Sequence, residues 1–162
     1  MRKTIFAAVA TVSVLVASMC ADQAVACSRV LYMGLDSTFV VGRSLDWKTP
    51  IPTSLYVYPR GIAKKGSDKP GAVEWTSKYG AVYSVSYDSG ITEGMNEMGL
   101  VINGLFCKGT VYDNAETAGR PPMSLAMFVG WLLDMNATTA EVVEVLKKHD
   151  FSLSGATFDN GC

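Results

Sequence analysis

The sequence has little of what marks several protein classes. Its 162 residues hold four cysteines and one histidine, and the formal net charge is −1. No run of five basic residues occurs, which argues against nucleic acid or an acidic membrane surface as a partner. No cluster of residues has metal-ligand spacing, so neither a metal nor another cofactor is expected.

Long apolar runs are also scarce. The longest, residues 5–16, follows the basic pair Arg2 and Lys3 and precedes Ala24-Val25-Ala26. This is the layout of a secretory signal peptide cut after Ala26. A membrane-spanning helix needs about 20 apolar residues, so no stable membrane insertion is expected. We therefore predict a periplasmic or secreted protein whose residues 27–162 form one domain.

Within that domain the patterns predict strands first and helices later. Short β-rich runs are separated by turn signals, and residues 63–71 have the composition of an exposed loop. The strands are predicted over residues 27–33, 38–45, 54–58, 73–76, 81–87 and 100–106. A first helix is predicted to begin at Pro121-Pro122 and a second at Thr138, with Glu141 completing a capping box. The expected fold class is α+β, an antiparallel sheet with a helical layer.

Cys27 is the residue with the clearest chemistry. After the predicted cut it becomes the first residue, so its thiol lies beside its own free α-amine. An α-amine has a pKa of about 7.7–8.0 and a thiol about 8.5, so the amine can accept the thiol's proton near neutral pH. One residue would then supply both nucleophile and base. Removal of the signal also leaves an odd number of cysteines, Cys27, Cys107 and Cys162, so at least one thiol is unpaired or bonded to another chain.

Two charged residues are expected near this thiol. Counting across the turn at residues 34–37 places Arg43 beside the start of Cys27's strand, and Asp46 follows three residues later. A cation there would raise the thiolate fraction, and a carboxylate could receive the α-ammonium or hold the arginine. Arg43 and Asp46 could equally form a surface ion pair.

Other roles for Cys27 stay open as well. Ala24-Val25-Ala26-Cys27 partly matches a lipoprotein box, so a lipid-carrying cysteine is one alternative. A buried, inert thiol is the other.

Three blocks of sequence now allow a family comparison. Cys27–Val30, Val41–Trp47 and Gly94–Leu100 resemble, in the same order, the choloylglycine hydrolase family. This family contains penicillin V acylases and conjugated bile salt hydrolases, which are N-terminal-nucleophile hydrolases. The resemblance implies a four-layer αββα sandwich. It also implies hydrolysis of linear amide bonds in small N-acyl amines such as penicillin V or conjugated bile salts.

The resemblance also implies roles for individual residues. Cys27 would attack the amide carbonyl, and Arg43 and Asp46 would hold the nucleophile and its amine in place. Phe106 falls at the family's oxyanion position, which donates a backbone N–H. Phe106 could instead shape the acyl pocket or pack in the core. Residues 94–99 are interpreted as a turn between two strands, with Asn96 and Glu97 as turn residues, and His149 as a surface residue.

The chain departs from the family pattern near its end: the resemblance runs from Cys27 to about His149, and residues 154–162 match no family motif. Family members continue well beyond this length, and the remainder supplies a further oxyanion asparagine, a catalytic arginine and the second half of the sandwich. We therefore expect only the N-terminal half of such an enzyme, with an inactive truncated fragment as an alternative. Such a half would expose an unpaired sheet edge and an uncovered apolar face, and a homo-oligomer remains open.

Overall fold

A computed structural model describes residues 27–47, 49–107, 110–113 and 119–155. The predicted signal peptide, residues 1–26, lies outside the described residues, as does Cys162. Among the helices that are described, none has the length and apolar character needed to cross a membrane.

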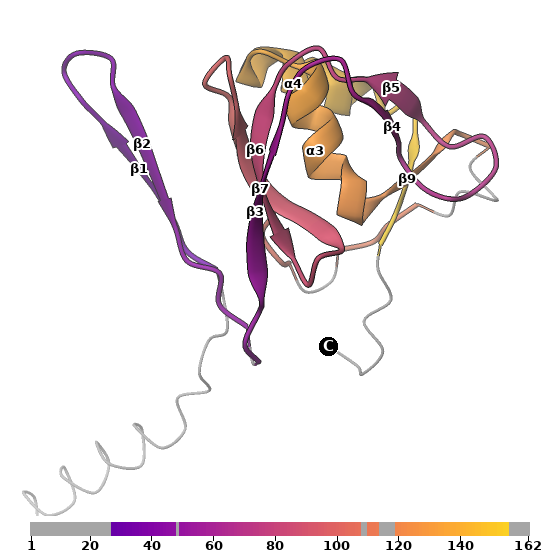
Figure 1. Ribbon diagram of the computed structural model, residues 1–162, viewed down its shortest axis with the longest axis horizontal. Coiled ribbons are helices and arrows are strands. Elements are labelled where there is room, and N and C mark those ends of the chain that lie inside the picture. Colours follow the sequence, from indigo (N-terminus) through magenta and orange to yellow (C-terminus); the bar gives the residue numbers. More distant parts are fainter. Residues whose placement is uncertain (1–26, 48, 108–109, 114–118, 156–162) are drawn as a thin grey trace, which may run out of the picture.

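Strands precede helices along most of the described chain (Figure 1). In order the elements are β1 (Arg29–Met33), β2 (Phe39–Arg43), β3 (Thr53–Tyr58), β4 (Ala63–Lys65), β5 (Glu74–Thr76), β6 (Ala81–Ser86), β7 (Gly90–Asn96), β8 (Val101–Asn103), β9 (Pro122–Ser124), α3 (Leu125–Met135), α4 (Thr139–Lys148) and β10 (Ser152–Ser154).

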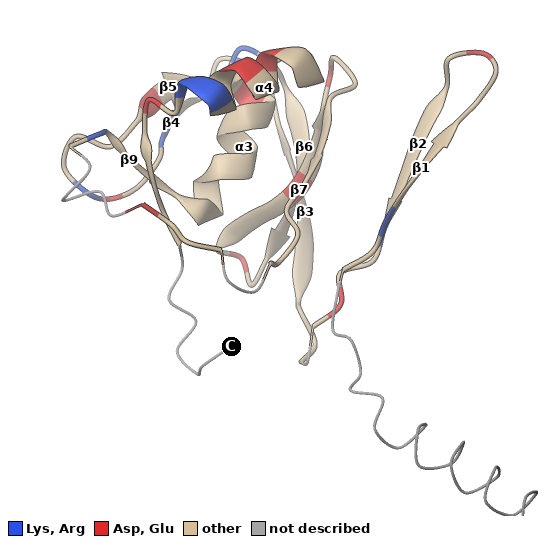
Figure 2. Cartoon of the chain, turned by 180° about the vertical axis from the view of Figure 1, so that it is seen from behind, with Lys and Arg blue, Asp and Glu red and all other residues tan. Residues whose placement is uncertain are grey.

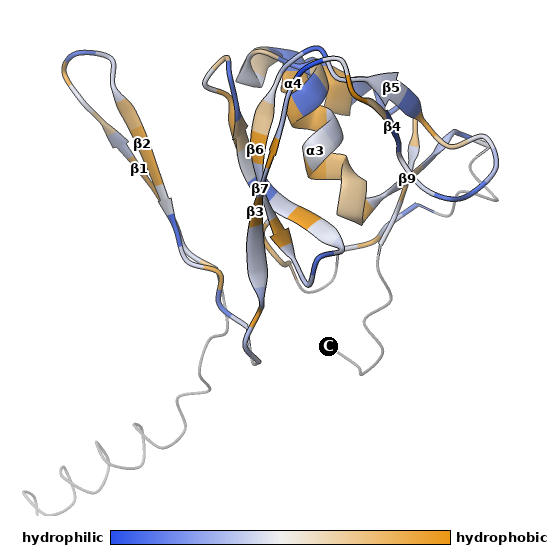
Figure 3. Ribbon diagram, viewed as in Figure 1, coloured by the Kyte–Doolittle hydropathy of each residue, from blue (hydrophilic) through white to orange (hydrophobic). Residues whose placement is uncertain are grey.

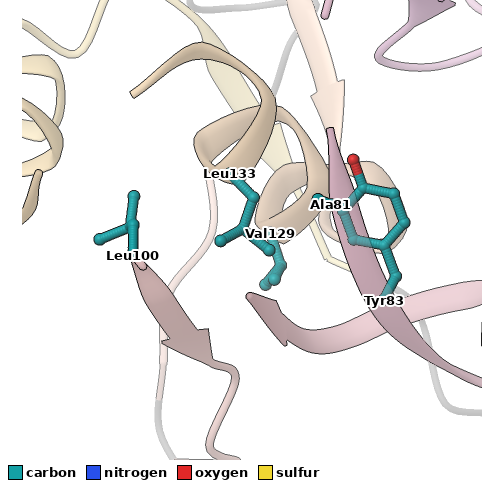
Figure 4. Close-up of a cluster of buried hydrophobic side chains, with 5 residues drawn as sticks. All are labelled: Ala81, Tyr83, Leu100, Val129 and Leu133. Carbon is teal, nitrogen blue, oxygen red and sulfur yellow. The ribbon is translucent and has the colours of Figure 1, made fainter. Parts of the chain in front are cut away.

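The body of the molecule is a four-stranded antiparallel sheet, in the order β3-β6-β7-β8, with α3 packed on one face. Buried side chains from the sheet, the β7–β8 turn and the helix form one cluster between them (Figure 4): Ala81, Tyr83, Leu100, Val129 and Leu133. Gly94 allows the close approach of helix and sheet, because a Cβ there would lie 2.5 Å from the Val82 carbonyl oxygen and 2.9 Å from Leu133 Cδ1. The predicted α+β class is confirmed.

The β1–β2 hairpin is separate from this body and stands apart from it in Figure 1. All five residues of β1 are exposed, although four of them are apolar, and β2 carries an apolar stretch as well (Figure 3). On the outer face of the main sheet, Leu55 and Val57 are also exposed. The structure therefore has the uncovered apolar faces that were expected.

Residues 63–71 are not the plain loop that was predicted. β4 begins there and pairs with β5, placing Lys64 opposite Trp75. The Lys64 side chain then reaches the buried carboxylate of Asp134, 70 residues away. This contact is distant in sequence, so local composition could not reveal it.

The first helix also starts later than predicted. Pro122 is in β9, paired in parallel with Ser152 of β10, and α3 begins at Leu125. The Pro122 carbonyl oxygen accepts a hydrogen bond from Val73, 3.0 Å away, which favours an extended backbone over a helical one. This parallel pair is the exception to the predicted antiparallel arrangement.

The second helix begins where it was predicted. Thr138 caps α4, and its hydroxyl accepts from the Glu141 N–H at 3.2 Å. The Glu141 carboxylate bonds to the Ala137 N–H at 2.6 Å, one residue before the position that a standard capping box uses.

Two strand boundaries differ from the prediction as well. β7 runs through Gly94 to Asn96, where a turn was expected to begin, and β8 ends at Asn103 rather than at Phe106. Gly104 still donates to the Thr92 carbonyl of β7 at 2.7 Å, and the segment that follows β8 contacts the hairpin and Trp47.

Candidate active site

Cys27 lies at the open end of the β1–β2 hairpin, half-buried. The two segments of the hairpin remain hydrogen-bonded beyond the ends of β1 and β2. The Ser44 N–H donates to the Ser28 carbonyl at 3.0 Å, and the Ser28 N–H donates to Ser44 Oγ at 3.1 Å. This extension brings Cys27 Sγ to 3.9 Å from the Asp46 carbonyl oxygen. The proximity of Cys27 and Asp46, predicted by counting across the turn, is present in the structure.

The Asp46 carboxylate has a local partner. Its Oδ2 accepts a hydrogen bond from Ser44 Oγ at 2.6 Å. Ser44 thus bonds to both Ser28 and Asp46 and links the start of the hairpin to the segment that follows β2.

The Arg43 side chain is nearly buried, with 4% of it exposed. Its Nε lies 3.1 Å from Glu93 Oε2 as an ion pair, although the N–H is not aligned for a hydrogen bond. Its Nη2 donates to the Gly104 carbonyl. Arg43 therefore pairs with Glu93 rather than with Asp46, and the option that Asp46 holds the arginine is wrong for this geometry.

Phe106 lies in the segment that Arg43 contacts. Its ring meets Trp47 edge-on, with ring centroids 5.3 Å apart, and the residue is 49% exposed. Core packing, one of the options for Phe106, is therefore not what the structure has. The pocket-shaping and oxyanion-donor roles stay predictions.

Asn96 and Glu97 both have structural contacts. The Asn96 amide donates to the carbonyls of Leu133 and Asn136 at 2.8 and 2.7 Å, and its oxygen accepts N–H groups within the turn. Glu97 pairs with Arg60 at 2.5 Å, and the Arg60 hydrogen bond holds the pKa of the Glu97 carboxyl below its usual value. These contacts match the turn role that was predicted for the pair.

Sequence reasoning missed two residues of the main sheet that contact the hairpin. Glu93 of β7 and Asn103 of β8 are cross-strand partners, and they meet Arg43 and Arg29 respectively. One signal was present in the sequence: counting across the turn makes Arg29 and Arg43 direct neighbours. Two like charges in one cross-strand pair are unfavourable without a counter-ion.

His149 ends α4 in a left-handed backbone conformation and remains partly exposed. Its Nε2 lies 2.5 Å from an Asp113 carboxylate oxygen, which fits the predicted surface role.

One cavity of about 450 Å³ lies between β5 and the helices, lined in part by Trp131, Val145 and Phe151. None of the four predicted site residues lines this cavity. The part of the chain that is described contains no group of three or more potential metal ligands.

The sheet with helices on one face has the fold of N-terminal-nucleophile hydrolases and covers about 40% of those chains. The model of the choloylglycine hydrolase family, which comprises linear amide C–N hydrolases, matches residues 27–154. The chain belongs to this family.

Three relatives illustrate the similarity. A penicillin V acylase structure from Agrobacterium tumefaciens shares 40% identity at a TM-score of 0.75, covering 80% of this chain and 40% of that one. Penicillin V acylase of Pectobacterium atrosepticum is 30% identical over 160 residues, 94% of this chain and 43% of its own length. A mutant conjugated bile acid hydrolase from Clostridium perfringens, at 24% identity and a TM-score of 0.62, shares the fold over 79% of this chain and 39% of its own. The chain thus spans about 40% of the length of these relatives.

Proposed function

We propose that this chain forms part of an exported amidase in which Cys27 is the N-terminal nucleophile. The observation that carries the proposal is a set of contacts at the open end of the hairpin. Cys27 Sγ lies beside the Asp46 carbonyl, and Arg43 and Trp47 reach the segment that holds Phe106. Membership of a family of linear amide hydrolases supports the same reaction type.

The proposed reaction needs no cofactor. The α-amine of Cys27 accepts the thiol proton while the sulfur attacks the amide carbonyl, and the oxyanion bonds to the Phe106 backbone N–H. Collapse of this intermediate breaks the C–N bond, and the α-ammonium gives its proton to the leaving amine. Water then attacks the thioester, with the amine again accepting a proton, which releases the carboxylic acid and restores the thiol.

The proposed substrates are small amides with a hydrophobic acyl group: penicillin V, conjugated bile salts or N-acyl homoserine lactones. Two relatives are penicillin V acylases and one is a conjugated bile acid hydrolase. In this chain the rings of Trp47 and Phe106 lie at the proposed site, where they would contact an apolar acyl group.

The first test is the mature N-terminus. Mass spectrometry of the protein secreted from its complete coding region, read downstream of Cys162, should find an unblocked Cys27 as the first residue. A different first residue would contradict the mechanism, because an amide-bonded nitrogen cannot act as the base. A diacylated Cys27 in the membrane fraction would instead support a lipid-anchored envelope protein.

The second test is hydrolysis of penicillin V and of a conjugated bile salt by that secreted protein. Cys27→Ser should lower kcat by at least about a thousandfold, because the α-amine removes the proton of a hydroxyl far less readily than that of a thiol. Cys107→Ser is the matched control and should keep the parent rate. Equal rates for Cys27→Ser and the parent would overturn the assignment. If the coding region ends at Cys162 and the parent hydrolyses neither substrate, the inactive-fragment alternative is favoured.

A further inference from the structure

Four side chains join the hairpin to the main sheet, and they form two cross-strand pairs. Arg29 and Arg43 face each other in β1–β2, and Glu93 and Asn103 face each other in β7–β8. Arg29 Nε donates to Asn103 Oδ1 at 2.8 Å, Asn103 Nδ2 donates to Glu93 Oε2 at 3.0 Å, and Glu93 Oε2 lies 3.1 Å from Arg43 Nε. The result is a continuous polar chain between two sheets that share no backbone ladder.

The charges of these four side chains indicate which residue contributes most to holding the hairpin against the main sheet. Two guanidinium groups in one cross-strand pair repel each other, and the Arg43 side chain is almost wholly withdrawn from water. A charge in such a place needs an opposite charge at contact distance. Glu93 supplies the single carboxylate in the set, since the Asp46 carboxylate bonds to Ser44 instead.

The position of this chain links it to the proposed nucleophile. Among the described residues, the side-chain hydrogen bonds and ion pairs between residues 28–43 and the main sheet all lie at the open end of the hairpin. Cys27 is two residues before Arg29, and Arg43 also bonds to Gly104, two residues before Phe106. The placement of the thiol relative to the Phe106 segment therefore depends on these contacts. Figure 2 shows charged residues at the base and at the tip of the hairpin, with uncharged residues between them.

We propose that Glu93, supported by Asn103, is a positioning residue for the amidase site. Its carboxylate neutralises Arg43 and keeps the start of the hairpin docked against the segment 104–106. This inference rests on the proposed function for its link to catalysis, whereas the docking itself can be measured without turnover.

The test uses the full chain, with amide hydrogen exchange followed by NMR. Glu93→Gln keeps the shape and removes the charge, so the Ser44 amide, which bonds to Ser28 at the base, should exchange at least about tenfold faster. The Gly34 amide, bonded to Thr38 at the hairpin turn, should change less than about twofold. Alkylation of Cys27 by iodoacetamide, read on its own peptide, should accelerate in parallel.

Two further variants distinguish the effect of the Glu93 charge from a general loss of stability. Glu93→Gln/Asn103→Asp returns one carboxylate to the set and should recover most of the Ser44 protection. Glu74→Gln removes the same charge from an exposed pair with Lys65, 3.6 Å away, and should leave exchange at Ser44 and alkylation of Cys27 unchanged.

Three outcomes would overturn the proposal: unchanged Ser44 exchange in a folded Glu93→Gln protein, equal loss of protection across β6 and β7, or no recovery in the double variant. Failure of the proposed function looks different. A mature N-terminus other than Cys27, or full hydrolysis by Cys27→Ser, would remove the catalytic link and leave the exchange results standing.

Discussion

The body of this molecule buries even a charged side chain, whereas the hairpin leaves large apolar side chains exposed. In the body, Asp134 is fully buried, and its carboxylate accepts hydrogen bonds from Lys64, Trp75 and Tyr83. In the hairpin, large apolar residues such as Tyr32 and Met33 are about two-thirds exposed, at 65% and 66%.

This contrast separates two sources of stability. The body combines apolar clusters with a buried ion pair whose partners are hydrogen-bonded, an arrangement that holds only while every member is present. The hairpin has an intact backbone ladder but little burial, and it is held to the body by side chains at one end. Changes in the body should therefore affect global unfolding, and changes in the hairpin should stay local.

The largest predicted effect comes from breaking the buried ion pair. Asp134→Asn removes the negative charge and leaves the Lys64 ammonium, whose side chain is 10% exposed, without a counter-ion. The free energy of unfolding should fall by about 3–5 kcal/mol, measured by urea denaturation with circular dichroism. Glu144→Gln, which breaks an exposed pair with Lys147, should cost less than about 1 kcal/mol. Similar losses in the two variants would mean that the buried network is not what stabilises the body.

How much of this contrast the sequence could predict depends on how local each feature is. The hairpin, with Cys27 and Asp46 side by side, followed from one turn signal and a count of residues. The start of α4 followed from Thr138, whose cap bond spans three residues. Both predictions depended on contacts that are short in sequence or fixed by a ladder.

Features that depend on distant packing were missed. The strand pair β4–β5 positions Lys64 against Asp134, 70 residues later, and no local pattern marks either residue as buried. Likewise, the docking of the hairpin brings Arg43 to Glu93, and a periodic pattern in one strand carries no information on which edge of another sheet it meets. The residue types of the site were predictable, but the partner of Arg43 was not.

Two leucine substitutions, one in the body and one in the hairpin, test this difference in burial. Leu133 is fully buried and Leu31 is 46% exposed. Leu133→Ala should lower the free energy of unfolding by about 2–5 kcal/mol because it leaves a cavity in the core. Leu31→Ala should change it by less than about 0.5 kcal/mol. Both are measured by urea denaturation, and equal losses would show that the hairpin packs on the body in solution.

The pKa shifts of Tyr83 in the body and Asp36 in the hairpin predict a response to pH in each region. Burial, and then the hydrogen bond to Asp134, raise the pKa of Tyr83 above its usual value of about 10. A raised folded-state pKa contributes stability that is complete below the unfolded pKa and is lost as the pH rises through the folded one. Above about pH 10 the body should therefore lose stability, measured as a falling urea midpoint by near-ultraviolet circular dichroism.

Acid should act on the hairpin turn, with the smallest effect of the set. Hydrogen bonds from Thr38, the hydroxyl first and then the backbone N–H, hold the pKa of Asp36 below its usual value of about 3.9. A lowered folded-state pKa contributes stability that is present above the unfolded pKa and is lost as the pH falls through the folded one. Below about pH 4 the Gly34 amide should exchange faster before amides of β6 do. Thr38→Val should raise the Asp36 pKa in an NMR titration. Simultaneous loss of protection in both regions would mean that the hairpin and the body unfold as one unit.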